Sequence, residues 1–209
     1  IKTAMGAIYD LFTKCFKNHR NMKYQKRFTL IVESDKRLMK ILEAARDLNL
    51  PDWFVGAGVI RRSVWDYLNG RVKQKDKSPF EDIDLLYFSK KKLDEKKLIE
   101  RLTKACPGYK WDLHNDAFLH EFYSTKFKMN IEPLTCVEDD IIHWPELCTT
   151  VAVRLLPDNK LKIFAPYGLD VLMNMVFRRN PNARRSNWEK RVKEKLDRDL
   201  WPNVVVIND

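Results

Sequence analysis

Long apolar runs are missing from this chain of 209 residues, although 44% of its residues are apolar. No stretch approaches the ~20 uninterrupted apolar residues that a membrane-spanning helix needs, and the first ten residues carry no secretory signal pattern. The sequence therefore predicts a cytoplasmic protein without a membrane partner. Because the chain begins with Ile1 instead of Met, we expect that its natural N-terminus has been trimmed.

Cysteine is also scarce, with four residues that lie far apart in the sequence: Cys15, Cys106, Cys136 and Cys148. They form no C-x-x-C pair and no Cys/His spacing that is typical of a structural zinc site. We therefore expect reduced thiols packed inside an intracellular protein.

Internal repeats and low-complexity segments are absent as well, and the length is typical of one domain, with or without a short appendage. We expect residues 1–50 to form a helical segment packed on the core and residues 51–209 to form the main domain. Basic residues outnumber acidic ones, 39 Lys and Arg against 29 Asp and Glu, which gives a formal net charge of +10. This excess favours a polyanionic partner such as a nucleotide or a nucleic acid. The sequence does not indicate an oligomeric state.

The order of the apolar segments predicts an α+β (mixed α/β) fold, in which helices cover one side of a mixed sheet and a small C-terminal portion is helical. We expect helices over Ile1–Lys17, Asp35–Leu48 with Ser34 as N-cap, Val59–Leu68, Leu93–Lys104 and Asn187–Leu200, and one that starts at Pro166 and extends through Val176. We expect strands over Trp53–Val55, Ile83–Phe88, Trp111–Leu119 and Phe127–Ile131, and a hairpin of Thr150–Leu155 with Lys160–Phe164.

Two acidic residues, Asp82 and Asp84, alternate with apolar residues at the start of the second predicted strand. Side chains two apart in a strand point the same way, so these carboxylates share one face and repel each other. A hard divalent cation such as Mg²⁺ or Mn²⁺ is a natural counter-charge, and it binds nucleotide phosphates as well. A pair of solvated carboxylates at a strand end is the alternative.

A glycine-containing turn, Gly56-Ala57-Gly58, lies between the first predicted strand and the next helix. Backbone N–H groups at such a turn can bind a phosphate next to the helix N-terminus. The turn lacks the third glycine of the dinucleotide fingerprint and the Gly-Lys-Ser/Thr of a P-loop. Arg61 and Arg62 follow one turn into the helix, where they either reach a bound triphosphate or are exposed.

These motifs together resemble a minimal nucleotidyltransferase family of the DNA polymerase β-like superfamily, a family of small, largely uncharacterised bacterial-type nucleotidyltransferases. The resemblance covers about residues 51–206, so that residues 51–209 are expected to be a nucleotidyltransferase-like domain. The segments that carry it are Gly56–Arg61, Val64–Asp66, Asp82–Leu85, Trp111-Asp112, Asn115–His120, Trp144–Glu146, Val153-Arg154, Ala165–Asp170 and Trp201-Pro202. The sequence departs from the family pattern at Asp116 and Phe118, where the family usually has Gln and a basic residue.

The resemblance implies transfer of NMP from an NTP to a hydroxyl or phosphate acceptor, with release of pyrophosphate and with Mg²⁺ or Mn²⁺ as cofactor. It implies that the glycine turn holds the triphosphate and that Asp82 and Asp84 bind metal ions. A third acid on a neighbouring strand is expected to help to activate the acceptor. Asp112 is the candidate because Trp111-Asp112-Leu113 repeats the pattern of alternating apolar and acidic residues, and Glu132 is the substitute.

Two alternative functions remain open at this stage. One is a non-catalytic nucleic-acid-binding protein on a nucleotidyltransferase fold, and the basic segments Lys14–Lys40 and Arg178–Arg198 are compatible with binding of RNA or of the nucleotide. The other is a metal-dependent glycosyltransferase with a D-x-D motif, which the position of the glycine turn before Asp82 disfavours. His114 and His120 are candidates for substrate contact or for ordinary packing.

Overall fold

The computed structural model describes residues 22–73, 79–80, 82–184 and 187–208. The predicted helix over residues 1–17 lies outside these ranges. Within them, no helix is both long and apolar enough to cross a membrane. The cysteines that the structure describes, Cys106, Cys136 and Cys148, form no disulfide.

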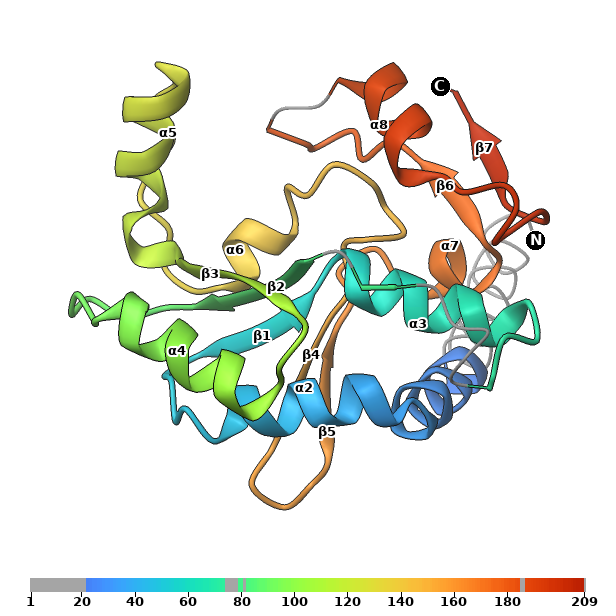
Figure 1. Ribbon diagram of the computed structural model, residues 1–209. Coiled ribbons are helices and arrows are strands. Elements are labelled where there is room, and N and C mark those ends of the chain that lie inside the picture. The colour runs from blue at the N-terminus through green and yellow to red at the C-terminus, as the bar shows by residue number, and fades with distance from the viewer. Residues whose placement is uncertain (1–21, 74–78, 81, 185–186, 209) are drawn as a thin grey trace, which may run out of the picture.

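A mixed sheet with the strand order β3-β2-β1-β4-β5 lies at the centre of the fold (Figure 1). Strand β3 runs parallel to β2, and the other neighbours pair antiparallel. The predicted strands at Trp53 and Ile83 and the predicted hairpin are confirmed. The strands are β1 (Trp53–Gly56), β2 (Asp82–Tyr87), β3 (Lys110–Asn115), β4 (Ala152–Leu155) and β5 (Leu161–Phe164).

Three long helices pack against this sheet: α2 (Lys36–Arg46), α3 (Gly58–Leu68) and α4 (Glu95–Ala105). A further helix over residues 22–34, which the sequence patterns did not indicate, precedes α2. The predicted N-cap of α2 is wrong by one residue. Asp35 accepts a hydrogen bond from the Arg37 backbone N–H, whereas the Ser34 hydroxyl donates to the Ile31 carbonyl oxygen and so belongs to the preceding helix.

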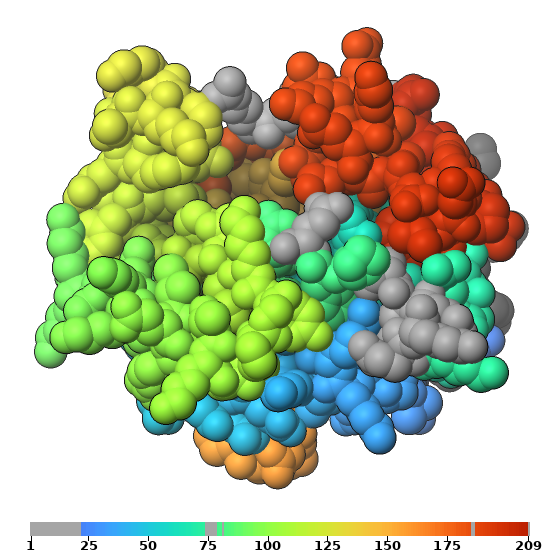
Figure 2. All heavy atoms as spheres, viewed as in Figure 1, coloured from blue at the N-terminus to red at the C-terminus, as the bar shows by residue number. Residues whose placement is uncertain are grey.

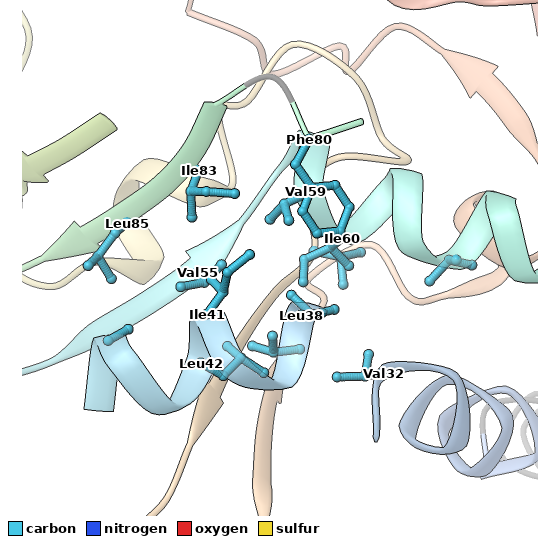
Figure 3. Packing of buried hydrophobic residues seen from close by; sticks show 14 of the residues in the cluster. Val32, Leu38, Ile41, Leu42, Val55, Val59, Ile60, Phe80, Ile83 and Leu85 are labelled. Carbon is cyan, nitrogen blue, oxygen red and sulfur yellow. The ribbon is translucent and has the colours of Figure 1, made fainter. Parts of the chain in front are cut away.

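The main core fills the space between α2 and the sheet. Ile83 and Leu85 of β2 point into it, together with Val55 of β1, and they meet Ile41 and Leu42 of α2 (Figure 3). Because side chains alternate along a strand, Asp82, Asp84 and Leu86 face the opposite side of the sheet. The core side therefore fixes the strand, and the other side is available for polar groups.

A smaller apolar cluster covers part of that opposite face. Phe54 and Leu86 meet Val137 and Ile141 there, the latter from the short helix α6 (Glu138–Ile141). This cluster covers the sheet beyond Leu86, whereas Asp82 and Asp84 are only partly buried. The predicted α+β class, a mixed sheet flanked by helices, is thus confirmed.

The segment after β3 differs from the prediction. The strand ends at Asn115, whose side chain accepts a hydrogen bond from the Ala117 backbone N–H and so starts a 3-10 turn over Asp116–Phe118. Helix α5 (Leu119–Phe127) follows and ends at Lys128 in a left-handed conformation. The prediction of a strand over Phe127–Ile131 is wrong because the aromatic residues there belong to a helix whose side chains are only partly buried.

The C-terminal portion is less helical than predicted. The helix expected from Pro166 is limited to α7 (Asp170–Met173), and Val176 lies in strand β6 (Val176–Arg178), which pairs in parallel with β7 (Val205–Ile207). The last helix, α8 (Trp188–Lys195), ends before the predicted Leu200. Buried Phe177 and Trp201 pack their rings against Trp65 of α3, so this portion joins the main core.

Candidate active site

The glycine turn joins β1 to α3 and is under backbone strain. Ala57 has φ 56° and ψ −125°, a conformation that residues with a Cβ rarely adopt. A Cβ on Gly56 would lie 2.5 Å from Cη2 of Trp144, whereas a Cβ on Gly58 would meet nothing within 4 Å. Helix α3 begins without a side-chain cap and without an acidic residue in its first turn. Its N-terminal N–H groups are therefore suited to an anion.

The three candidate acids lie on the neighbouring strands β2 and β3, on the open face of the sheet, which is the face opposite the main core. Asp84 of β2 pairs in register with Asp112 of β3. Asp82 lies two residues before Asp84, so its side chain points to the same side of the sheet. Burial raises the pKa of the Asp84 carboxyl to about 7, and repulsion from Asp112 and then from Asp82 adds to the effect. The site thus concentrates negative charge around one partly desolvated carboxyl.

Asp112 also contacts a histidine, His114, on its own strand. Nε2 of His114 lies 2.9 Å from Oδ1 of Asp112, and this hydrogen bond is the largest cause that lowers the pKa of Asp112 and raises that of His114. Among the described residues, no three His, Cys, Asp or Glu side chains converge closely enough to hold a metal ion. In this conformation Asp82 and Asp84 line a shared cavity that Asp112 does not line.

That cavity has a volume of about 210 Å³, and both acidic and cationic groups line it. Asp82 and Asp84 are the acidic residues of the lining. The glycine turn and cationic side chains from two distant parts of the chain complete it. Its lining includes Ala57, Gly58, Arg61 and Arg62 from the start of α3, and Arg191 and Lys195 from α8. Figure 2 shows a hollow between α5 and the C-terminal segment that holds α8, above the strands.

Arg61 and Arg62 are buried rather than exposed. The Arg61 guanidinium lies 5.3 Å from the ring centre of Trp65 and 5.9 Å from that of Trp201, and Arg62 lies 5.3 Å from that of Trp201. Desolvation by burial is the largest cause that lowers the pKa of Arg61. Its Nε has no hydrogen-bond partner among the described residues. Aromatic rings hold this cation in place, and its Nε is left without an acceptor among the described residues.

Arg191 is positioned by a buried carboxylate. It forms a two-point ion pair with Glu146, which is fully buried and also accepts a hydrogen bond of 2.8 Å from the Thr149 hydroxyl. Arg191 and Lys195 were predicted only as members of the basic segment Arg178–Arg198, and no motif indicated Trp144 and Thr149 as cavity residues. The sequence signal that was available for Arg191 and Lys195 is the group of basic residues in the short helix α8. This group does not show which face of the helix turns to the site.

The remaining candidates lie elsewhere. Glu132 is exposed in a segment without regular structure. It lines neither this cavity nor a neighbouring cavity that Asp84 also lines. His114 lines the neighbouring cavity, beyond Asp84, whereas His120 lines neither of the two.

Comparisons with known proteins agree with this arrangement. The sequence profile of a family described as nucleotidyltransferase matches residues 43–206. A solved structure, described as an NMR structure that reveals a CCA-adding enzyme head domain, is 27% identical with a TM-score of 0.68 over 88% of this chain and 96% of that one. No curated protein matches the chain.

Two longer solved chains show only partial likeness. A tRNA-processing enzyme in an apo form is 13% identical, with a TM-score of 0.40 over 66% of this chain and 34% of that one. A CCA-adding enzyme in complex with ATP is 14% identical, with a TM-score of 0.38 over 74% of this chain and 33% of that one. The family profile spans most of the chain, and the resemblance indicated by the motifs is confirmed: this protein belongs to the nucleotidyltransferase family and is a nucleotidyltransferase.

Proposed function

We propose that the protein transfers NMP from an NTP to a hydroxyl or phosphate acceptor, with Mg²⁺ or Mn²⁺ as cofactor and with release of pyrophosphate. The observation that carries this proposal is the mixed lining of the first cavity. Two carboxylates, four cationic side chains and an uncapped helix N-terminus line the same cavity. A triphosphate needs donors and positive charge along its length, and a reacting phosphorus needs metal-binding acids at one end.

The residues present fit a hard divalent cation. Carboxylate oxygens are the ligands that Mg²⁺ and Mn²⁺ prefer, and Asp82 and Asp84 offer them on one side of one strand. Burial is the largest cause that raises the pKa of Asp84, and the negative charges of Asp112 and Asp82, which a cation would offset, add to it. Asp112, opposite Asp84, is the nearest candidate for a third ligand. When bound, such an ion would neutralise phosphate charge and lower the pKa of the acceptor hydroxyl.

The protein's own groups then have distinct roles. The N–H groups of the turn at Gly56, Ala57 and Gly58 bind the triphosphate, and Arg61 and Arg62 neutralise its charge. The acceptor oxygen forms a bond to the α-phosphorus as the bond from that phosphorus to the bridging oxygen breaks. The acceptor proton passes to a carboxylate, for which Asp112 is the candidate, and pyrophosphate leaves. The guanidinium groups are held before the substrate arrives, so little reorganisation is needed.

An RNA hydroxyl is one acceptor class that the excess of positive charge supports, beside small hydroxyl compounds. The test is transfer of label from NTPs radiolabelled at the α-phosphate to a mixed pool of RNA and small molecules. We expect transfer only with Mg²⁺ or Mn²⁺, and at least a hundredfold loss in Asp82→Asn and Asp84→Asn, in line with the loss of one electrostatic catalytic group.

Asp158→Asn is the matched control because Asp158 is exposed in the turn between β4 and β5 and lines neither this cavity nor its neighbour. Equal transfer by the Asp84→Asn variant and the parent would refute the metal-site assignment. Salt-sensitive RNA binding without any transfer would instead support a non-catalytic binding protein.

A further inference from the structure

A second cavity of about 190 Å³ adjoins the first one and shares two of its residues, Asp84 and Trp144. It lies on the same open face of the sheet, on the side toward Leu86 and α5. Aromatic side chains of Tyr123 and Trp144 line it, and so does Asp116. A ligand with its phosphates in the first cavity therefore extends past Asp84 into a chamber with aromatic walls.

Asp116 has an unusual environment. Its side chain is fully buried, and neither carboxyl oxygen has a hydrogen-bond partner among the described residues. Burial is the largest cause that raises its pKa to about 9; repulsion from Asp140 and Asp52 adds to this, and Arg184 partly offsets it. Buried polar groups in native proteins are nearly always paired, so two unpaired acceptors on one carboxyl call for an explanation.

The neighbouring acid, Asp140, shows what a paired carboxylate looks like here. Its Oδ2 accepts a hydrogen bond of 2.8 Å from Nε1 of Trp144, and its Oδ1 forms an ion pair with Arg184. Arg184 also donates to the Asp139 carbonyl oxygen at 3.1 Å. Asp140 thus fixes the indole of Trp144 as a wall, whereas the carboxyl group of Asp116 makes no such contact with the described part of the chain.

We propose that this second cavity binds the base of the nucleotide substrate and that Asp116 selects guanine by accepting hydrogen bonds from its N1–H and 2-amino groups. The proposal rests on the nucleotidyl transfer proposed above. Guanine is the standard base that offers two adjacent N–H donors on one edge, which matches the two unpaired acceptors of one carboxylate. The rings of Tyr123 and Trp144 provide surfaces against which a base can stack.

Ionisation of Asp116 is consistent with this role. Without ligand, a proton occupies the carboxyl because burial and the nearby acids disfavour its charge. Two N–H donors stabilise the ionised form, so the proton moves to solvent as guanine binds. The unpaired carboxyl lowers the stability of the free protein, and guanine binding offsets this loss. A base that lacks one of the two donors leaves an acceptor unpaired, so the site discriminates against it.

The test compares GTP with ITP, which lacks only the 2-amino group, and with XTP, which carries an oxygen there. Calorimetric titrations with Mn²⁺ present measure the three affinities in the parent and in Asp116→Asn. We expect the parent to bind GTP at least tenfold more tightly than ITP or XTP, because a lost donor leaves a buried acceptor unpaired. An amide presents one donor and one acceptor, so Asp116→Asn should prefer XTP to GTP.

Asp158→Asn serves as the control and should keep the parent's order of affinities. A gain of XTP affinity cannot arise from misfolding, so the variant remains informative even if its stability changes. Equal affinities of the parent for GTP and ITP, or an unchanged order in Asp116→Asn, would overturn the guanine assignment and leave nucleotidyl transfer standing. Failure of the parent to bind any NTP would instead overturn the proposed function, and this assignment with it.

Discussion

Alanine substitutions at the two glycines of the turn should have opposite consequences. In Gly56→Ala, the new Cβ would lie 2.5 Å from Cη2 and 2.7 Å from Cζ3 of Trp144, and 3.0 Å from Cβ of Ala152. These atoms belong to an indole held by Asp140 and to a paired strand, so they cannot move freely. Overpacking of this kind costs about 1–3 kcal/mol. For a chain of this length, that lowers the Tm by roughly 2–12 °C.

Gly58→Ala is the matched control for stability. Its Cβ would meet nothing within 4 Å, and Gly58 already begins α3, so the free energy of unfolding should change by less than about 1 kcal/mol. The methyl group would, however, lie at the wall of the first cavity, where the triphosphate is proposed to bind. We therefore expect weaker NTP binding in Gly58→Ala without a loss of stability.

Differential scanning calorimetry and NTP titration separate the two effects. In a Trp144→Phe background, which lacks the two clashing carbons, Gly56→Ala should cost clearly less, so a double-mutant cycle measures the contact directly. Equal Tm values for Gly56→Ala and Gly58→Ala, or an undiminished cost of Gly56→Ala beside Phe, would refute the reasoning that Gly56 exists to admit Trp144.

Three further predictions concern charge. The pKa of Asp116 is raised to about 9 from 3.8, so the stability that its protonated carboxyl contributes is full below pH 3.8 and is lost as the pH rises through 9. Asp116→Asn should therefore gain stability relative to the parent over this range, by at most about 1.4 kcal/mol per pH unit. Denaturation curves at several pH values measure this gain. Arg191→Ala should cost about 1–3 kcal/mol in urea unfolding because Glu146 loses its partner, whereas Lys190→Ala, on the exposed side of α8, should cost less than about 0.5 kcal/mol, and similar costs would contradict this. Mn²⁺ should raise the unfolding free energy of the parent by about 2.7 kcal/mol at a hundredfold excess over Kd, and an equal gain in Asp84→Asn would exclude Asp84 as a ligand.

The elements that local sequence patterns predicted correctly are those with short-range causes. The strand at Ile83 follows from alternation, and the helix after Gly58 follows from its apolar face. The prediction failed at residues 127–131 and after Pro166, where short apolar segments fit a helix and a strand equally well and tertiary packing decides. A strand expected through Leu119 ended at Asn115 because a side-chain cap competes with the sheet, which periodicity does not reveal.

The candidate site likewise combines residues that local motifs indicate with residues that only tertiary packing brings in. Asp82, Asp84 and the glycine turn could be found from local motifs, and the parallel register of β2 and β3 places Asp112 opposite Asp84. The other walls come from residues 60 to 110 positions further along the chain, including Trp144 and Arg191. No local pattern links these residues to β2, since their positions depend on long-range contacts such as the ion pair of Arg191 with Glu146.

Three unfavourable features lie at the two cavities, and binding of a ligand would account for them. Ala57 has a strained backbone, Nε of Arg61 lacks a partner among the described residues, and so do both oxygens of Asp116. Each of these residues lines one of the cavities. A fold selected for stability alone would remove such costs, for instance with glycine at position 57 or an apolar residue at position 116. The unpaired Nε of Arg61 in the first cavity and the unpaired carboxyl oxygens of Asp116 in the second are instead complementary to the two ends of a single nucleotide.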